Sequence, residues 1–196
     1  MNDLAGLTEA SDCDIEKIRE ALGYDPRIGS SYLFPGSGYG GSCFPKDIKA
    51  LLEYAKKIGC SLPVIEAVDR SNKDHKLWLS DRTRDHFGQD LREKVIALWG
   101  LAFKPRTDDI RESPSIDTVE KLLGNNATIR VYDPEPRARE KFRLRFEDRL
   151  TYCSNRDDAL DGADALLIAT DADQFRGVDP GIFISRLKNP PVVIDA

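Results

Sequence analysis

The residues best suited to chemistry lie in one segment, residues 35–47, with the sequence PGSGYGGSCFPKD. Cys43 comes two residues before Pro45, and proline favours the first turn of a helix, so we expect the thiol at a helix N-terminus. Free amide hydrogens and the positive end of the helix dipole favour the thiolate form there. Lys46 and Asp47 add a cation and a group that can transfer protons, as a nucleophile site requires. An inert buried cysteine is the alternative, and these residues alone leave both interpretations open.

The glycines of the same segment also match a second pattern. Gly36, Gly38 and Gly41 satisfy GxGxxG, the dinucleotide-binding fingerprint. That fingerprint directly follows a strand, and a second strand ending in an acidic residue comes about 20 residues later. Here a proline-broken loop precedes the glycines and a helix follows them. We therefore interpret the glycines as loop residues that let the backbone approach a ligand closely.

The other three cysteines carry no comparable signal. Cys13, Cys60 and Cys153 form no CxxC pair, and the sequence has only two histidines. We expect these cysteines to be inert and buried. We also expect neither a disulfide framework nor a metal site.

Charge and hydropathy limit the classes of partner. The chain has 29 Lys and Arg against 34 Asp and Glu, a net charge of −5, so we expect no nucleic-acid partner. The longest apolar runs, residues 96–103 and 165–170, are too short to cross a bilayer, and we expect no membrane association. The first residues lack the pattern of a secretory signal, which favours a cytoplasmic protein.

Helical periodicity dominates residues 1–88. Apolar residues recur at helical spacing in two stretches that end before Gly23 and Gly59. Residues 24–42 hold too many glycines and prolines for a regular element. A further helix is predicted over residues 63–87, long enough to bridge two domains.

Residues 93–196 have a different pattern, in which short apolar runs alternate with helical stretches. This alternation predicts β-α-β units and a parallel sheet. Ser113 and Pro114 are typical of a helix start, and Gly124 is typical of its end. The charged run at residues 134–149 is interpreted as the solvated face of a helix. The predicted strands are VIALWGLAF, ATIRVYDP, LTYCS, ADALLIAT and PPVVIDA.

Three segments together resemble a known family. DPRIG (25–29), PGSGYGGSCFPKD (35–47) and GLAFKPRTDDIRESPS (100–115) are similar, in order and spacing, to the signature segments of UDP-glucose 6-dehydrogenases. YDP (132–134) and ADALLIATD (163–171) resemble later strands of that family. The resemblance implies an α/β chain with two domains. Residues 1–88 would form a helical central domain with the cysteine loop and the connecting helix, and residues 93–196 a Rossmann-like, parallel-sheet UDP-binding domain.

The resemblance also implies a reaction. The family oxidises a sugar alcohol twice with two NAD, and holds the intermediate aldehyde on a cysteine as a thiohemiacetal that becomes a hydrolysed thioester. Cys43 matches that nucleophile, and Asp47 matches an aspartate that orients water and handles protons. Lys46 and Arg111 resemble residues that contact NAD. No metal is implied.

The same residue-by-residue matching implies a set of substrate contacts. Arg27 resembles an arginine that reaches the substrate of a neighbouring subunit, and the family forms homodimers through its central helices. Without the motif, Lys104 and Arg111 would be read as surface charge, Tyr32 and Tyr39 as packing aromatics, and Glu112 as a brace for its loop. The implied substrate residues are Arg27, Tyr32, Leu33, Phe34, Pro35, Gly36, Gly40, Phe103 and Lys104.

One departure from the family limits the expected activity. Family members have an N-terminal Rossmann domain for NAD and a helix with a catalytic lysine and asparagine, and neither pattern is found in this sequence. We therefore expect this chain to be inactive alone, and the whole protein to convert UDP-glucose to UDP-glucuronate. The alternatives are a dehydrogenase of GDP-mannose or of a UDP-N-acetylhexosamine, and a non-catalytic module for UDP binding or dimerisation.

Overall fold

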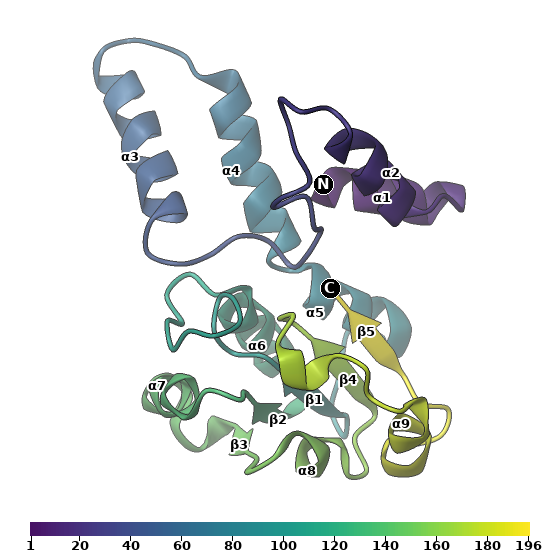
Figure 1. The fold of residues 1–196 in the computed structure, drawn as a ribbon. Helices are drawn as coiled ribbons and strands as arrows, with labels where there is room; N and C mark the ends of the chain where they lie inside the picture. Colours follow the sequence, from purple (N-terminus) through teal and green to yellow (C-terminus); the bar gives the residue numbers. More distant parts are fainter.

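Four helices form one half of the chain. The computed structural model describes residues 1–196 (Figure 1). The Asp14 carboxylate caps the second of these helices by accepting a hydrogen bond from the Glu16 amide at 2.9 Å. The third helix has Pro45 in its first turn, and Gly59 follows it with a φ of 71°, as a left-handed helix end requires. The helices are α1 (Asn2–Ser11), α2 (Ile15–Gly23), α3 (Phe44–Lys57) and α4 (Pro63–His75).

The single helix predicted over residues 63–87 is wrong in one respect, because the structure divides it. α4 ends at His75 and α5 (Trp78–Phe87) begins after a turn of two residues. The Leu77 amide bonds to the Asp74 carbonyl three residues back instead of continuing the helical ladder. The Lys76 carbonyl accepts a hydrogen bond from the Thr118 hydroxyl at 3.5 Å, outside the helix. Packing against the second half therefore interrupts the helix at this turn.

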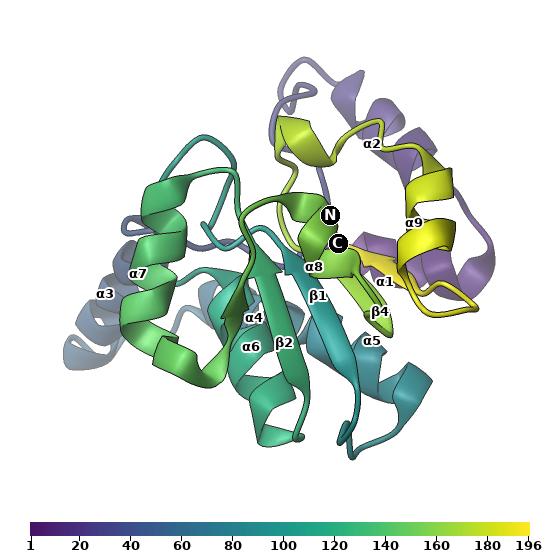
Figure 2. The ribbon, with the colours of Figure 1, turned by 90° about the horizontal axis from the view of Figure 1, so that it is seen from below.

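A five-stranded parallel sheet forms the second half, as the sequence predicts. The strand order is β3-β2-β1-β4-β5, and every pairing is parallel. Figure 2 shows β2, β1 and β4 side by side. Strands buried on both faces are typical of parallel sheets, and β4 is buried at every position. The strands are β1 (Val95–Trp99), β2 (Thr128–Tyr132), β3 (Thr151–Tyr152), β4 (Ala165–Ile168) and β5 (Val193–Asp195).

Helices cover both faces of this sheet and define two cores. On one face α5, α6 (Pro114–Gly124) and α7 (Pro136–Phe146) pack around Ile96 and Leu98. On the other, α8 (Arg156–Leu160) and α9 (Pro180–Arg186) pack around Trp99. α5 was predicted as part of the helical half, but its Leu79 is fully buried in the sheet's core. Most of the charged run falls on α7, which buries only Ala138, Phe142 and Phe146. Its Arg137, Arg143 and Arg145 are exposed, so the solvated-face interpretation is confirmed.

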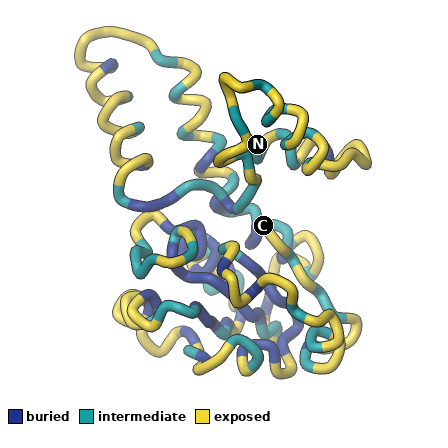
Figure 3. The backbone as a smooth tube through the Cα atoms, viewed as in Figure 1, coloured by how far each residue is buried: buried dark blue, intermediate teal, exposed yellow.

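The helical half buries little of its own surface. Thr8 is the only buried residue of α1, α2 has none, and α4 has only Asn72. Figure 3 shows the hairpin of α3 and α4 as mostly exposed, in contrast to the sheet. No helix of the chain has the length and apolar character needed to span a membrane. The glycine-rich loop between α2 and α3 runs along the joint between the halves, where the predicted site residues lie.

Candidate active site at the joint between the two halves

Cys43 lies at the N-terminus of α3, as the proline pattern predicts. It is the N-cap residue, its side chain is exposed, and its carbonyl accepts the Asp47 amide at 2.9 Å. The Ser42 hydroxyl lies 3.8 Å from Cys43 Sγ. Lys46 Nζ and Asp47 Oδ1 are 3.2 Å apart on the first turn, and both side chains are more than 60% exposed. The predicted nucleophile, cation and carboxylate therefore share one accessible helix end.

The glycine loop leads to this helix end and docks on the sheet half. A Cβ at Gly40 would lie 2.2 Å from the Glu112 carbonyl oxygen, and one at Gly41 would lie 2.8 Å from the Phe103 ring. The Gly41 amide donates to the Arg111 carbonyl at 2.8 Å. These glycines permit close approach of two backbones, so their space is filled by protein. A helix, α2, and not a strand precedes the loop, so its glycines do not have the structural setting of a dinucleotide-binding fingerprint.

Asn72 of α4 fixes the middle of the same loop. Its Oδ1 accepts the Tyr39 amide at 2.7 Å, and its Nδ2 donates to the Tyr39 carbonyl at 3.1 Å. Tyr39 also packs edge to face against Phe44, the first residue of α3. The Asn72 side chain thus fixes the backbone of the loop at Tyr39, four residues before the cysteine.

Glu112 joins both halves through its carboxylate. Lys49 of α3 donates to Glu112 Oε1 at 2.7 Å, and Lys76 donates to Oε2 at 2.8 Å. These bonds, first that of Lys49 and then that of Lys76, lower the pKa of Glu112 to about 2. A carboxyl with a depressed pKa in the folded state stabilises that state above its unfolded pKa, here about 4.5. That stabilisation is lost as the pH falls from about 4.5 toward 2. At neutral pH Glu112 is ionised and both ion pairs, with Lys49 and Lys76, are present.

Arg111, next to Glu112, faces the cysteine side of the joint. It makes a paired contact with Asp109, at 2.8 Å for Nη2 to Oδ2. The Asp109 hydrogen bond raises the pKa of Arg111 above its ordinary value. Arg111 and Lys46 line one open cavity of about 660 Å³ together with Ser42. The two predicted NAD contacts therefore meet in one space.

Lys104 occupies a second position, just beyond the C-terminal end of β1. Its ammonium lies 5.3 Å from the centre of the Phe103 ring, and the side chain makes no ion pair. It lines a cavity of about 220 Å³ between the ends of β1, β2 and β4. Ligands of open parallel sheets bind at such strand ends, where the connections diverge. An unpaired cation there suits an anionic ligand.

Asp133 fills part of this strand-end region from inside the protein. Its Oδ2 accepts the amides of Leu101 at 2.6 Å and of Ala102 at 3.1 Å, and the residue is 4% exposed. In a dinucleotide-binding sheet the loop amides after the first strand hold a phosphate. Here a carboxylate of the chain itself takes those donors.

The predicted substrate residues before the cysteine line a third cavity. Tyr32, Leu33, Phe34 and Gly36 border a space of about 630 Å³ against α1 and α4. Tyr32 is 97% exposed, so it is not a packing aromatic. Pro35 borders a neighbouring space of about 160 Å³. The structure thus distributes the predicted contacts over separate openings, and the first half alone lines the one beside Tyr32.

Arg27 is exposed, as are two of the three cysteines other than Cys43. Arg27 forms a two-point contact with Asp25, with Nη2 2.6 Å from Oδ2, and its side chain is 87% exposed. The prediction that Cys13 and Cys60 are buried is wrong, because one lies in the turn after α1 and the other in the connection from α3 to α4. Cys153 is buried, as predicted, and burial raises the pKa of its thiol.

Comparison with known proteins gives this geometry a context. The sequence profile of the UDP binding domain of the UDP-glucose/GDP-mannose dehydrogenase family matches residues 97–196, and that of the family's central domain matches residues 1–74. The chain belongs to this family. The family resemblance inferred from the three signature segments is confirmed, and it covers both halves.

Individual members of the family are similar over almost the whole chain. The UDP-glucose 6-dehydrogenase of Pseudomonas aeruginosa is 40% identical in an alignment 198 residues long, gaps included, that covers 98% of this chain. The structure of a UDP-glucose dehydrogenase from Pyrobaculum islandicum superposes over 99% of the chain with a TM-score of 0.89 at 34% identity. A UDP-D-ManNAc dehydrogenase from Pyrococcus horikoshii superposes over 100% with a TM-score of 0.78 at 27% identity.

The chain is shorter than these members of the family. It spans 43% of the P. aeruginosa enzyme, 42% of the P. islandicum chain and 43% of the P. horikoshii chain. Within residues 1–196, only the second half contains strands.

Sequence reasoning missed three residues that organise the joint. Asn72, Lys49 and Lys76 were not assigned a role, although each bonds across elements there. Asn72 and Lys76 continue the four-residue spacing of Val64 and Val68 on one helix face. Polar residues that interrupt an apolar face in this way are the signal that would have identified them.

Proposed function

We propose that residues 1–196 are the cysteine-bearing and nucleotide-sugar-binding part of an NAD-dependent UDP-glucose 6-dehydrogenase, which converts UDP-glucose to UDP-glucuronate. The observation that carries the proposal is the position of Cys43, exposed at a helix N-terminus and held by its glycine loop against the loop after β1 that bears Lys104 and Arg111. The high identity to named UDP-glucose 6-dehydrogenases supports the choice of substrate.

The proposed chemistry assigns a distinct task to each group of this chain. The Cys43 thiolate adds to the aldehyde intermediate, and the resulting tetrahedral carbon stays bound instead of leaving as a reactive product. Asp47, on the first turn of the same helix, orients the water that hydrolyses the thioester and takes up its proton. Lys104 binds the anionic nucleotide sugar at the strand ends.

We assign NAD to the cavity that Lys46 and Arg111 line. Lys46 and Arg111 contribute two cations to the cavity of about 660 Å³, as the phosphates of a dinucleotide require, and Ser42 places that cavity beside the cysteine. When bound, NAD accepts hydride from the sugar carbon. Two side-chain contacts do not orient a dinucleotide, so we infer that residues 1–196 alone do not turn over UDP-glucose.

The choice of sugar is the part of the proposal with alternatives. A GDP-mannose or UDP-N-acetylhexosamine dehydrogenase has the same fold, and the similarity to a UDP-D-ManNAc dehydrogenase supports the second of these. A non-catalytic UDP-binding or dimerisation module is the alternative from another class. The grouping of Cys43, Lys46 and Asp47 at one helix end favours a catalytic protein.

Calorimetric titration of this chain tests the proposed ligand. We expect UDP and UDP-glucose to bind, GDP-mannose to bind more weakly, and NAD to show no tight binding. Lys104→Ala should weaken UDP-glucose binding by roughly 10-fold, the loss of about 1.4 kcal/mol expected for one charge-assisted contact. Lys57→Ala, at the far end of α3, removes an exposed lysine and should change nothing. Preference for GDP-mannose, or an unchanged affinity in Lys104→Ala, would contradict the proposal.

We also infer a homodimer through the helices of the first half. α3 exposes Leu51 and Tyr54, Ile58 directly after it is also exposed, and α4 exposes Val64 and Val68. Side chains of this size on two adjacent helices are an apolar surface that association would cover.

Sedimentation velocity tests this inference. The chain should sediment as a dimer, and Leu51→Asp with Tyr54→Asp should sediment as a monomer because two charges enter the apolar surface. Leu144→Asp, at a leucine on α7 that is more exposed than Leu51, should remain a dimer. A monomeric parent chain would rule out this interface.

A further inference from the structure

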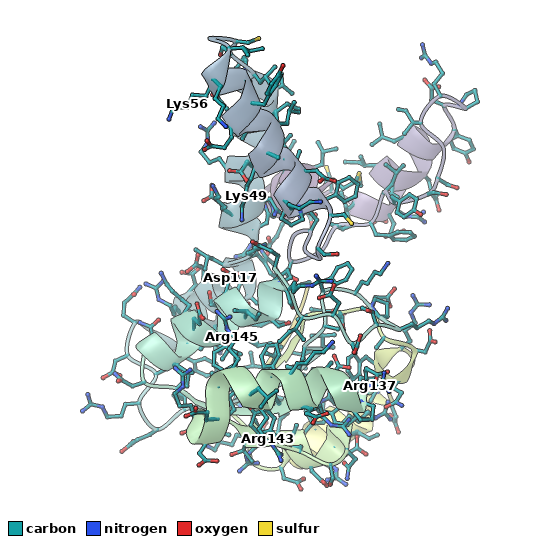
Figure 4. All side chains as sticks on the ribbon, turned by 90° about the vertical axis from the view of Figure 1, so that its left-hand side faces the viewer. Lys49, Lys56, Asp117, Arg137, Arg143 and Arg145 are labelled. Atoms are coloured by element: carbon teal, nitrogen blue, oxygen red, sulfur yellow. The ribbon has the colours of Figure 1, made fainter.

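Glu112 is the one carboxylate that holds two helices of the first half against a loop of the second. Lys49 comes from the second turn of α3, the helix that begins at Cys43, and Lys76 comes from the turn between α4 and α5. The Lys76 side chain is 7% exposed, and its ammonium also lies 4.0 Å from Asp117. Figure 4 shows Lys49 on α3 and Asp117 at the start of α6 on the two sides of this joint.

The backbone of Glu112 is as constrained as its side chain. Its φ is 53°, a left-handed conformation that costs energy for a residue with a side chain. Its carbonyl oxygen lies against Gly40, where no larger residue fits, and the Arg111 carbonyl before it accepts the Gly41 amide. A strained residue persists only where its surroundings fix it, and here these surroundings are the loop that leads to Cys43.

The same loop offers a matched pair that lacks this connection. Asp108 accepts Lys141 of α7 at 2.7 Å, with side-chain exposures of 36% and 44%. The Lys49–Glu112 pair has the same distance and exposures of 51% and 40%. The two ion pairs differ in the half of the chain to which the lysine belongs, and Glu112 has a second lysine partner, Lys76, which Asp108 lacks. Solvent-exposed pairs contribute little stability, so the interest of Glu112 is in the elements that it links.

We propose that Glu112 is a positioning residue for the cysteine site, which sets the place of the first turn of α3 relative to the loop that carries Lys104 and Arg111. It does so through Lys49 and Lys76, and without it the helix that bears Cys43 is free to move relative to the strand ends. The consequence for catalysis rests on the proposed function, but the effect on geometry does not.

Distance measurement between two spin labels tests the geometry directly in this chain. Labels are attached to Cys43 and to Leu144→Cys on α7, in a background of Cys13→Ser and Cys60→Ser, because Cys153 is buried. Glu112→Gln keeps the shape of the side chain and removes its charge. We expect the distance distribution to shift or broaden in Glu112→Gln and, less strongly, in Lys49→Met, because Glu112→Gln also loses the contact with Lys76. Adding Lys49→Met to Glu112→Gln should change nothing further, since Lys49 acts through Glu112.

Asp108→Asn is the control variant for this measurement. Asp108→Asn should leave the distribution as in the parent chain, although it breaks an ion pair in the same loop. Circular dichroism melting of each variant shows whether the halves are still folded. An unchanged distribution in both folded Glu112→Gln and folded Lys49→Met, or an equal change in Asp108→Asn, would overturn the proposal.

A second readout separates positioning from substrate binding in the whole dehydrogenase. Glu112→Gln should lower kcat by roughly 10- to 100-fold, the size of effect that a displacement of about 1 Å produces. At saturating NAD the KM for UDP-glucose should stay within about twofold, because Glu112 lines the cavity assigned to NAD and not the Lys104 cavity assigned to the nucleotide sugar. A rise in KM with kcat unchanged would overturn the assignment. Absence of dehydrogenase activity in the parent protein would instead contradict the proposed function, leaving the spin-label result to decide the role of Glu112.

Discussion

Cys43→Ala is expected to lower UDP-glucuronate formation by on the order of 10⁴-fold in the whole dehydrogenase of which we propose this chain is a part, a loss typical of removing a covalent nucleophile. Alanine cannot add to the aldehyde, so the tetrahedral carbon needed for the second oxidation does not form. NADH absorbance measures the rate, and chromatography of the nucleotide sugars shows whether the acid is produced.

The other exposed cysteines provide the controls for this result. Cys13→Ala and Cys60→Ala remove thiols that are also accessible, yet lie in turns away from the joint, and should leave the rate unchanged. UDP-glucose should bind the Cys43→Ala chain as tightly as the parent, which separates lost chemistry from lost folding. A Cys43→Ala enzyme that retains a tenth of its activity would exclude the cysteine mechanism.

Gly40→Ala is expected to be the most damaging small substitution in the glycine loop. The added carbon would lie 2.2 Å from the Glu112 carbonyl oxygen and 3.0 Å from the Phe103 side chain. A backbone oxygen cannot rotate away, so the loop must leave the sheet half or the Glu112 backbone must shift. Overpacking of this kind costs about 1–3 kcal/mol, which thermal or urea unfolding measures. Activity should fall further, because the displaced loop carries Cys43.

Gly36→Ala is the matched control in the same loop. A Cβ at Gly36 meets no atom within 4 Å, and its backbone is not in the left-handed region. Its free energy of unfolding should therefore stay at or slightly above that of the parent chain, since alanine restricts the unfolded state. Equal destabilisation by the two substitutions would mean that close packing at Gly40 is not what the loop requires.

Most of the fold could be predicted from the sequence because local sequence patterns and tertiary packing favour the same elements. Ser113, Pro114 and Gly124 predicted the bounds of α6, and the apolar runs predicted all five strands. The break between α4 and α5 was missed, because no proline or glycine marks it. It arises from contacts of Lys76 with Thr118 and Glu112, which lie 42 and 36 residues away in the chain.

The sequence predicted part of the candidate site. Proline placement predicted that Cys43 starts a helix, and the motifs selected Lys104 and Arg111 as the cations to examine. The function of Gly40 in packing was not accessible, because the sequence does not tell whether a glycine makes room for a ligand or for another backbone. Glu112 was interpreted as a loop brace, and its two lysines come from α3 and from the turn between α4 and α5, which only the folded chain brings together.

The uneven burial of the two halves implies that this chain does not unfold as one cooperative unit. Helices α1 to α4 bury four residues in all, namely Thr8, Pro45, Ala55 and Asn72, whereas the strands contribute to two closed cores. Segments with few apolar contacts open at a smaller free energy than the global transition. Amide protons of the α3–α4 hairpin should therefore exchange through local opening, and those of β1 and β4 only when the sheet unfolds. The cysteine thus begins a helix of the more easily opened unit, and its order depends on anchorage to the more stable one.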